Sequence, residues 1–157
     1  MDGGVMPDLE FTVTQSEPRR ILATTGSAPS QPEVSAVVGP LFGAVASAIE
    51  RSGGRLGVGV ATYAMGPDGG IDIVAGFEWD ADPLPGLSVV DLPNVLVAST
   101  THYGVMATIG DSWSALMHWA ADEGFFPAGP GREIYHESSS PDQSTWVTEL
   151  QQPIARR

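Results

Sequence analysis

Residues 110–154 read GDSWSALMHWAADEGFFPAGPGREIYHESSSPDQSTWVTELQQPI, and this stretch decides the fold. Its first part carries apolar residues at positions i, i+3, i+4 and i+7, namely Trp113, Leu116, Met117 and Ala120. That spacing places the four side chains on one face of a helix. We therefore expect a helix over residues 111–123, with Asp111 as its N-cap and Gly124 after its end.

Two strands are expected after this helix. The Gly-Pro-Gly sequence at residues 129–131 is typical of a turn and leads into the first strand, GREIYHE. The second strand is TWVTELQQPI, in which alternation divides the side chains between two faces, with Trp146, Thr148 and Leu150 on one and Val147 and Glu149 on the other. Tyr135 and Trp146 then lie on neighbouring strands, either as part of a binding site or as ordinary cross-strand packing.

The first half of the chain has the same order of elements. A helical spacing ends at Gly53–Gly54 and comprises Leu41, Val45, Ala48 and Ile49. The strands LGVGVATYAM and IDIVAGFEW follow, and the sequence GPDGG between them favours a hairpin turn. Residues 11–23 supply strand-like patterns ahead of the helix, and residues 87–104 supply the corresponding strand of the second half.

These patterns predict an α+β fold. We expect two strand–helix–strand–strand repeats, about residues 9–79 and 87–154, related by a pseudo-twofold axis. Their strands form an antiparallel sheet, their two helices cover part of it, and a ligand cleft lies between the repeats. The chain of 157 residues suits one domain, since a domain of this length buries roughly 70% of its unfolded surface.

The charge of the chain limits its partners. Seven basic and 19 acidic residues give a formal net charge of −12, which disfavours nucleic acid and anionic membranes and favours cations at long range. The absence of cysteine excludes a disulfide, a thiolate nucleophile and a cysteine-ligated metal. The first ten residues lack the pattern of a signal peptide, and no run approaches a membrane span. We expect a cytoplasmic protein, monomeric or homodimeric.

Three segments of the second half carry a family resemblance. The order of WAADEGF, PAGPGREIY and WVTELQQPI resembles the GyrI-like small-molecule-binding domain, which also occurs as the effector domain of multidrug-sensing regulators. The resemblance implies the duplicated α+β layout and a pocket that contains the glutamate of WVTEL, Glu149. The family often has His-x-Gly-Pro-Tyr before the second helix, whereas this chain has His102, Tyr103, Gly104, Val105 and Met106. The tyrosine of that motif is therefore missing.

Aromatic residues and one glutamate are the candidate ligand-binding residues. The expected set is Trp146, Glu149, Tyr135, Tyr103, Trp113, Tyr63 and Phe77. A carboxylate beside aromatic faces suits a planar or cationic ligand, because stacking and cation–π attraction add to the ion pair. By residue type alone Glu149 is an ordinary solvated strand glutamate. The resemblance favours its place in the pocket.

Three functions are compatible with these residues. The first is a stand-alone domain that binds planar aromatic small molecules, including cations, and gives resistance by sequestration. The second, implied by the resemblance, is a hydrolase that opens the cyclopropane ring of DNA-alkylating natural products, with Glu149 and Tyr135 as catalytic residues. The third is an inhibitor of a topoisomerase. Both a binder and a hydrolase need the same pocket, so the sequence does not separate them.

Other chemistry is not expected. Ser112 lies in GDSWS, which lacks the final glycine of a nucleophile elbow, and is better explained as a residue of the first helical turn. His102, His118 and His136 lack metal-ligand spacing, and the glycines at residues 53–59 do not form a phosphate-binding motif. We expect neither a metal nor a cofactor.

Overall fold

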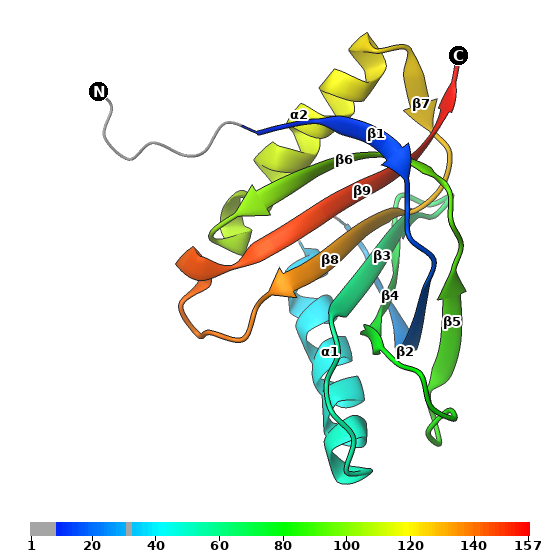
Figure 1. Ribbon diagram of the computed structural model, residues 1–157, viewed down its shortest axis with the longest axis vertical. Coiled ribbons are helices and arrows are strands. Elements are labelled where there is room, and N and C mark those ends of the chain that lie inside the picture. The colour runs from blue at the N-terminus through cyan, green and yellow to red at the C-terminus, as the bar shows by residue number, and fades with distance from the viewer. Residues whose placement is uncertain (1–8, 31–32) are drawn as a thin grey trace.

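A nine-stranded antiparallel sheet and two α-helices make up the part of the domain that the structure describes. The structure, a computed structural model, describes residues 9–30 and 33–157. Figure 1 shows the sheet in front of both helices, so that α1 and α2 cover one face of the sheet and the other face is turned toward the viewer. The predicted α+β class is confirmed.

The two repeats have the predicted order of elements. The first comprises β2 (Arg19–Ala28), α1 (Val34–Arg51), β3 (Gly59–Met65) and β4 (Ile71–Glu78). The second comprises β6 (Leu96–Tyr103), α2 (Ile109–Asp122), β8 (Gly131–Glu137) and β9 (Val147–Arg156). The sheet order β1-β6-β9-β8-β3-β4-β2-β5 is symmetric about the β8–β3 pair, as expected of a pseudo-twofold domain.

The outer strands link the two repeats. β1 (Thr12–Gln15) lies at the start of the first repeat but pairs with β6 of the second, and β5 (Ser88–Leu92) lies at the start of the second repeat but pairs with β2 of the first. Each repeat therefore donates a strand to the other. A short strand that the sequence did not predict, β7 (Phe125–Pro127), pairs with the far end of β9.

Each helix buries its apolar face on its own half of the sheet. Val45 and Ile49 of α1 are fully buried with Leu22 of β2, and Leu116 of α2 is fully buried with Leu150 of β9. The predicted helical spacings are therefore those of core residues. Both helices end as expected, because Gly53 and Gly124 follow them with positive φ values of 82° and 91°, which glycine adopts without steric cost.

The face without helices has a core of its own. Ile21, Val60 and Ile134 are fully buried there, together with Leu92 beside them. Figure 1 shows why, since the strands of the second repeat run obliquely across the view whereas β2, β4 and β5 run nearly vertically. The sheet bends strongly between the two halves, and side chains inside the bend shield one another.

Three local predictions were wrong. Asp111 is not the N-cap of α2, because the helix begins at Ile109 and its N-cap is Thr108. Asp111 lies in the first turn, where a carboxylate interacts favourably with the helix dipole. The strand expected over residues 87–104 is divided into β5 and β6 around Pro93, which lacks the N–H needed for strand pairing. Trp146 precedes β9 instead of belonging to it.

Helix α1 also differs from expectation in its length and composition, which would suffice to cross a membrane. It is the one such helix among the described residues. Within this domain it lies on the sheet, contacting β2 and β4, and buries Val34, Val45 and Ile49. It therefore serves at least in part as a core helix.

The burial of Leu116 leads to a test of the α2 packing. Leu116→Ala should lower the free energy of unfolding by about 2–4 kcal/mol, because it removes buried methyl groups and leaves a cavity. The exposed His118 on the same helix provides the control, and His118→Ala should change stability by less than about 0.5 kcal/mol. Urea unfolding followed by circular dichroism measures both. Equal small effects would show that α2 packs through another face.

Candidate functional site

A buried glutamate lies at the junction of the repeats. Glu133 is in the middle of β8, and only 6% of its surface is exposed. Its strand neighbour Ile134 belongs to the core on the open face, so alternation directs Glu133 to the face that the helices cover. A charged residue is seldom buried without partners, which makes its contacts informative.

Three uncharged donors surround the Glu133 carboxylate. The indole N–H of Trp113 donates to Oε2 with an N···O distance of 2.7 Å. The hydroxyl of Tyr63 donates to Oε1 at 3.1 Å, and the hydroxyl of Tyr135 donates to the same oxygen. The two tyrosine oxygens are 3.3 Å apart. We call Glu133, Trp113, Tyr63 and Tyr135 the Glu133 cluster.

The two tyrosines are held in their protonated form. Burial raises the pKa of the Tyr63 hydroxyl, and the negative charge of Glu133 raises it further. The same two causes, in the same order, raise the pKa of the Tyr135 hydroxyl well above its ordinary value. Both hydroxyls therefore act as neutral donors at physiological pH and bring no compensating positive charge to Glu133.

Elements from both repeats supply the cluster. Tyr63 comes from β3 of the first repeat, whereas Glu133, Tyr135 and Trp113 come from β8 and α2 of the second. Tyr63 is the register partner of Gly131 in the β3–β8 pair. A side chain at Gly131 would approach the Trp113 ring to 3.0 Å, so the glycine allows the indole to lie against the sheet.

Phe42 of α1, which was not predicted as a site residue, adds an aromatic ring beside Tyr135 of the Glu133 cluster. Its ring meets the edge of Tyr135 with centroids 5.3 Å apart and an interplanar angle of 87°. It also meets Phe77 at 5.5 Å and 65°. Phe77 therefore joins the cluster indirectly, behind Phe42.

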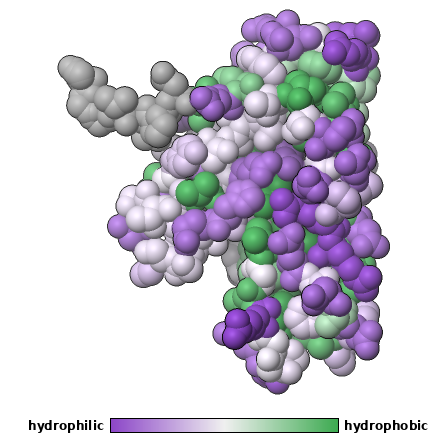
Figure 2. Space-filling model, viewed as in Figure 1, coloured by the Kyte–Doolittle hydropathy of each residue, from purple (hydrophilic) through white to green (hydrophobic). Residues whose placement is uncertain are grey.

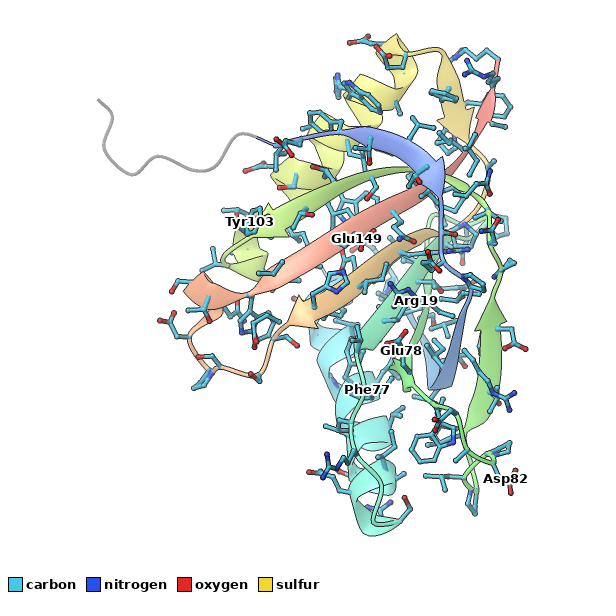
Figure 3. The ribbon with its side chains drawn as sticks, viewed as in Figure 1. Arg19, Phe77, Glu78, Asp82, Tyr103 and Glu149 are labelled. Carbon is cyan, nitrogen blue, oxygen red and sulfur yellow. The ribbon has the colours of Figure 1, made fainter. Side chains whose placement is uncertain are left out.

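The structure brings together only part of the predicted site. Tyr63, Tyr135 and Trp113 converge on one carboxylate, with Phe77 nearby. Glu149 is not among them, because it pairs in register with Ile134 and so lies on the opposite face of the sheet. Figure 3 shows Glu149 on the open face, toward the viewer, on the same side as Arg19 and Glu78.

Glu149 has a polar environment of its own. His136 Nε2 lies 2.7 Å from its Oε1, and the amide of Gln151 donates to Oε2 at 2.7 Å. Burial by itself raises the pKa of the Glu149 carboxyl, but the hydrogen bonds from His136 and Gln151 and the positive charges of His136 and Arg19 outweigh it and lower the pKa. Glu149 is thus a partnered carboxylate, with 25% of its side chain exposed.

Trp146 and Tyr103 also lie outside the Glu133 cluster. The indole N–H of Trp146 donates to the backbone carbonyl of Ser140 at 2.7 Å and so holds the loop between β8 and β9. Tyr103 is 46% exposed at the end of β6. Figure 2 shows the sheet face toward the viewer as a mixture of hydrophilic and hydrophobic residues.

The sequence contained a signal for Glu133 that went unused. In GREIYHE, Glu133 and Tyr135 are two residues apart and must share a face of the strand. An acidic residue on the same face as a candidate ligand-binding tyrosine could therefore have been identified. The family resemblance of the WVTEL segment favours Glu149 instead.

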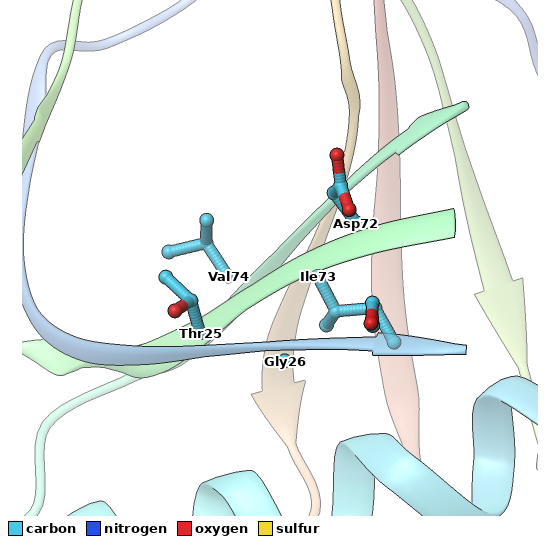
Figure 4. Close-up of a pocket in the computed structure, with 6 residues that line it drawn as sticks. Thr25, Gly26, Asp72, Ile73 and Val74 are labelled. Atoms are coloured by element: carbon cyan, nitrogen blue, oxygen red, sulfur yellow. The ribbon is translucent and has the colours of Figure 1, made fainter. Parts of the chain in front are cut away.

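The surface shows other features that do not join the cluster. One hollow has a volume of about 450 Å³, and Figure 4 shows the residues that line it, which are Thr25, Gly26, Ser27, Asp72, Ile73 and Val74. A second hollow, of about 530 Å³, lies near Trp79 and Arg55. Neither contains the convergent polar groups of the Glu133 cluster, so we place the candidate site at Glu133. Within the described residues, no group of three or more histidine, cysteine or acidic side chains is arranged to hold a metal ion.

A family model accounts for nearly the whole chain. The model of the GyrI-like small molecule binding domain matches residues 9–155. A search of curated proteins finds no significant match to the sequence.

Solved structures with the same fold include two of EcmrR. The protein in its DNA complex matches with a TM-score of 0.73 and 14% identity, over 95% of this chain and 58% of that chain. Its C-terminal domain matches with a TM-score of 0.71 and 13% identity, over 95% and 99% of the two chains. SAV2435 bound to tetraphenylphosphonium matches with a TM-score of 0.68 and 11% identity, over 93% and 94%. These identities show a shared fold and no more.

The environment of Glu149 predicts a pH dependence of stability. A lowered folded-state pKa stabilises the fold above the ordinary carboxyl pKa of about 4.5, and the contribution is lost as pH falls through the folded-state pKa. The stability advantage of the wild type over Glu149→Gln should therefore shrink as pH is lowered from 7 to about 3. Urea unfolding at several pH values measures it.

The exposed Glu50 of α1 serves as the control for this experiment. Glu50→Gln should follow the wild-type pH profile much more closely than Glu149→Gln does. A constant difference between wild type and Glu149→Gln across the pH range would contradict the assigned ion pair.

Proposed function

The chain belongs to the GyrI-like small molecule binding domain family, and from this premise we propose that it binds planar aromatic small molecules, cations among them, beside Glu133. The ligand-contacting residues in this proposal are Glu133, Tyr63, Tyr135 and Trp113, with Phe77 behind Phe42. A ligand role for Glu149, Trp146 or Tyr103 stays a prediction, and their contacts do not support it.

One observation carries the proposal. Glu133 is buried with three neutral donors, and no basic group of the described residues lies within 4.0 Å of its carboxylate. Hydrogen bonds reduce the cost of burying a charge but leave the charge itself in place. A bound cation would neutralise it in a setting of low dielectric, where the attraction is strong.

The aromatic residues select the kind of cation. Indole and phenol faces attract a cation through their quadrupoles and stack on flat rings, which favours aromatic cations over metal ions. The net charge of −12 would raise the local concentration of such cations. Tetraphenylphosphonium, which SAV2435 binds in a fold of this kind, has the required charge and rings and is a suitable probe.

Replacement of Glu133 tests the proposal. Glu133→Gln keeps the shape of the side chain but removes its charge, so binding of tetraphenylphosphonium should weaken at least about tenfold. Triphenylphosphine oxide has similar rings and no net charge, and its affinity should change much less. Isothermal titration calorimetry or quenching of tryptophan fluorescence measures both ligands.

Glu149→Gln is the matched control, because it makes the same change on a neighbouring strand but on the opposite face of the sheet. It should leave the affinity for both ligands unchanged. Weaker cation binding in Glu149→Gln than in Glu133→Gln would assign the site to the open face and contradict the proposal.

A hydrolase that opens strained cyclopropane rings is the second candidate. The observation that favours it is the Tyr135 hydroxyl at the Glu133 carboxylate, which provides a proton acceptor and an orienting group in one place. Water would add across the strained carbon–carbon bond. Its oxygen bonds to one carbon while the ring bond breaks, Glu133 takes one proton, and that proton returns to the electron pair left on the other carbon.

Mass spectrometry after incubation with a cyclopropane-bearing alkylator tests this second candidate. The product should be heavier than the substrate by one water, and Glu133→Gln should abolish turnover while a neutral substrate still binds. Glu149→Gln should retain turnover. Intact substrate after prolonged incubation with excess wild-type protein would leave binding as the function.

A further inference from the structure

Met106 lies where the two repeats meet. It begins the short 3-10 helix Met106–Thr108, between β6 and α2 of the second repeat. Its side chain nevertheless packs on a cluster formed mainly by the first repeat, to which α1 contributes Val34 and Phe42. Tyr63 and Tyr135 belong to the same packing group. Met106 thus belongs to the same group of packed apolar side chains as both tyrosines of the Glu133 cluster.

Two polar contacts hold Met106 in this position. Its backbone N–H donates to the side-chain oxygen of Gln143 at 3.0 Å. The hydroxyl of Thr148 lies 3.8 Å from its sulfur, and Thr148 is the register partner of Tyr135. The thioether is therefore placed beside the Tyr135 end of the Glu133 cluster. Trp113 lies against Gly131, the register partner of Tyr63.

The Glu133 cluster is closed in this structure. Glu133 and Tyr135 are only 6% and 9% exposed, so a cation as large as tetraphenylphosphonium reaches the carboxylate only if a neighbouring side chain moves. Phe42 is fixed by edge contacts with two other aromatic rings. Trp113 is fixed by its hydrogen bond to Glu133. Met106, which packs against the apolar group that includes Tyr135, is half-buried, unbranched and flexible, so it moves more easily than either ring.

We propose that Met106 determines the size of ligand that the Glu133 site accepts. In the closed form its side chain occupies the space beside Tyr135, and a large aromatic cation must displace it, whereas a small one needs less of that space. This inference rests on the proposed function. A large cation binds only molecules in which the side chain has moved. Its apparent affinity is therefore the intrinsic affinity multiplied by the fraction of such molecules.

Two cations of equal charge and different size test the role of Met106. Tetraphenylphosphonium carries four rings and phenyltrimethylammonium carries one. Met106→Ala removes the obstacle, so it should tighten binding of tetraphenylphosphonium by about tenfold and change binding of phenyltrimethylammonium by less than about threefold. Met106→Val, which removes less volume, should give the same order of effects and provides a second variant if the alanine protein does not fold.

Met117 supplies the matched control, since it is another half-buried methionine, on α2, outside the group that packs with Tyr135. Met117→Ala should leave the ratio of the two affinities unchanged. Equal changes for both cations in Met106→Ala, or the same size-dependent change in Met117→Ala, would overturn the inference.

Glu133→Gln separates this inference from the proposed function. If Glu133→Gln weakens binding of both cations but Met106→Ala leaves their affinity ratio unchanged, only the role of Met106 is wrong. If Glu133→Gln has no effect on either cation, in the wild type or in Met106→Ala, the proposed function is wrong and the inference fails with it.

Discussion

The pairing of β3 with β8 is the interaction on which the site depends. Its register sets a large residue opposite a small one three times, as Tyr135 opposite Gly59, Glu133 opposite Ala61, and Tyr63 opposite Gly131. The small partners leave room above the sheet for three side chains to meet. A register slip by one residue would turn Glu133 to the open face, away from both helices. The β3–β8 pair therefore joins the two repeats and also assembles the Glu133 cluster.

Periodicity predicted the elements of this fold because it reports contacts within a segment. Val45 and Leu116 mark the buried helix faces at helical spacing, and both are fully buried. The exchange of β1 and β5 between the repeats was not predicted, since strand pairing joins residues far apart in sequence. Alternation likewise separated Glu149 from Leu150 correctly. It does not state which face of a strand the helices will cover, so the sequence could not show that Glu149 and Glu133 lie on opposite faces of the sheet.

The two glutamates illustrate how environment decides the use of a carboxylate. Glu149 has an imidazole beside it and lies near Arg19, so positive charge within the protein already compensates it. Glu133 receives only N–H and O–H groups that stay neutral. The first arrangement stabilises the folded chain by an internal ion pair. The second leaves a negative charge that an external cation can compensate.

Arg132, the basic residue next to Glu133 in the chain, does not pair with it. It precedes Glu133 directly, and alternation along β8 turns it to the open face, where it is buried and donates to Ser16 Oγ at 3.2 Å and to the Pro93 carbonyl at 3.4 Å. Burial lowers the pKa of its guanidinium, and the nearby Arg19 lowers it further. The sheet itself thus separates a cation from the adjacent anion. Because both side chains are fixed by their own hydrogen bonds, Arg132 does not compensate the charge of Glu133, which is the condition that the proposed binding of a cation requires.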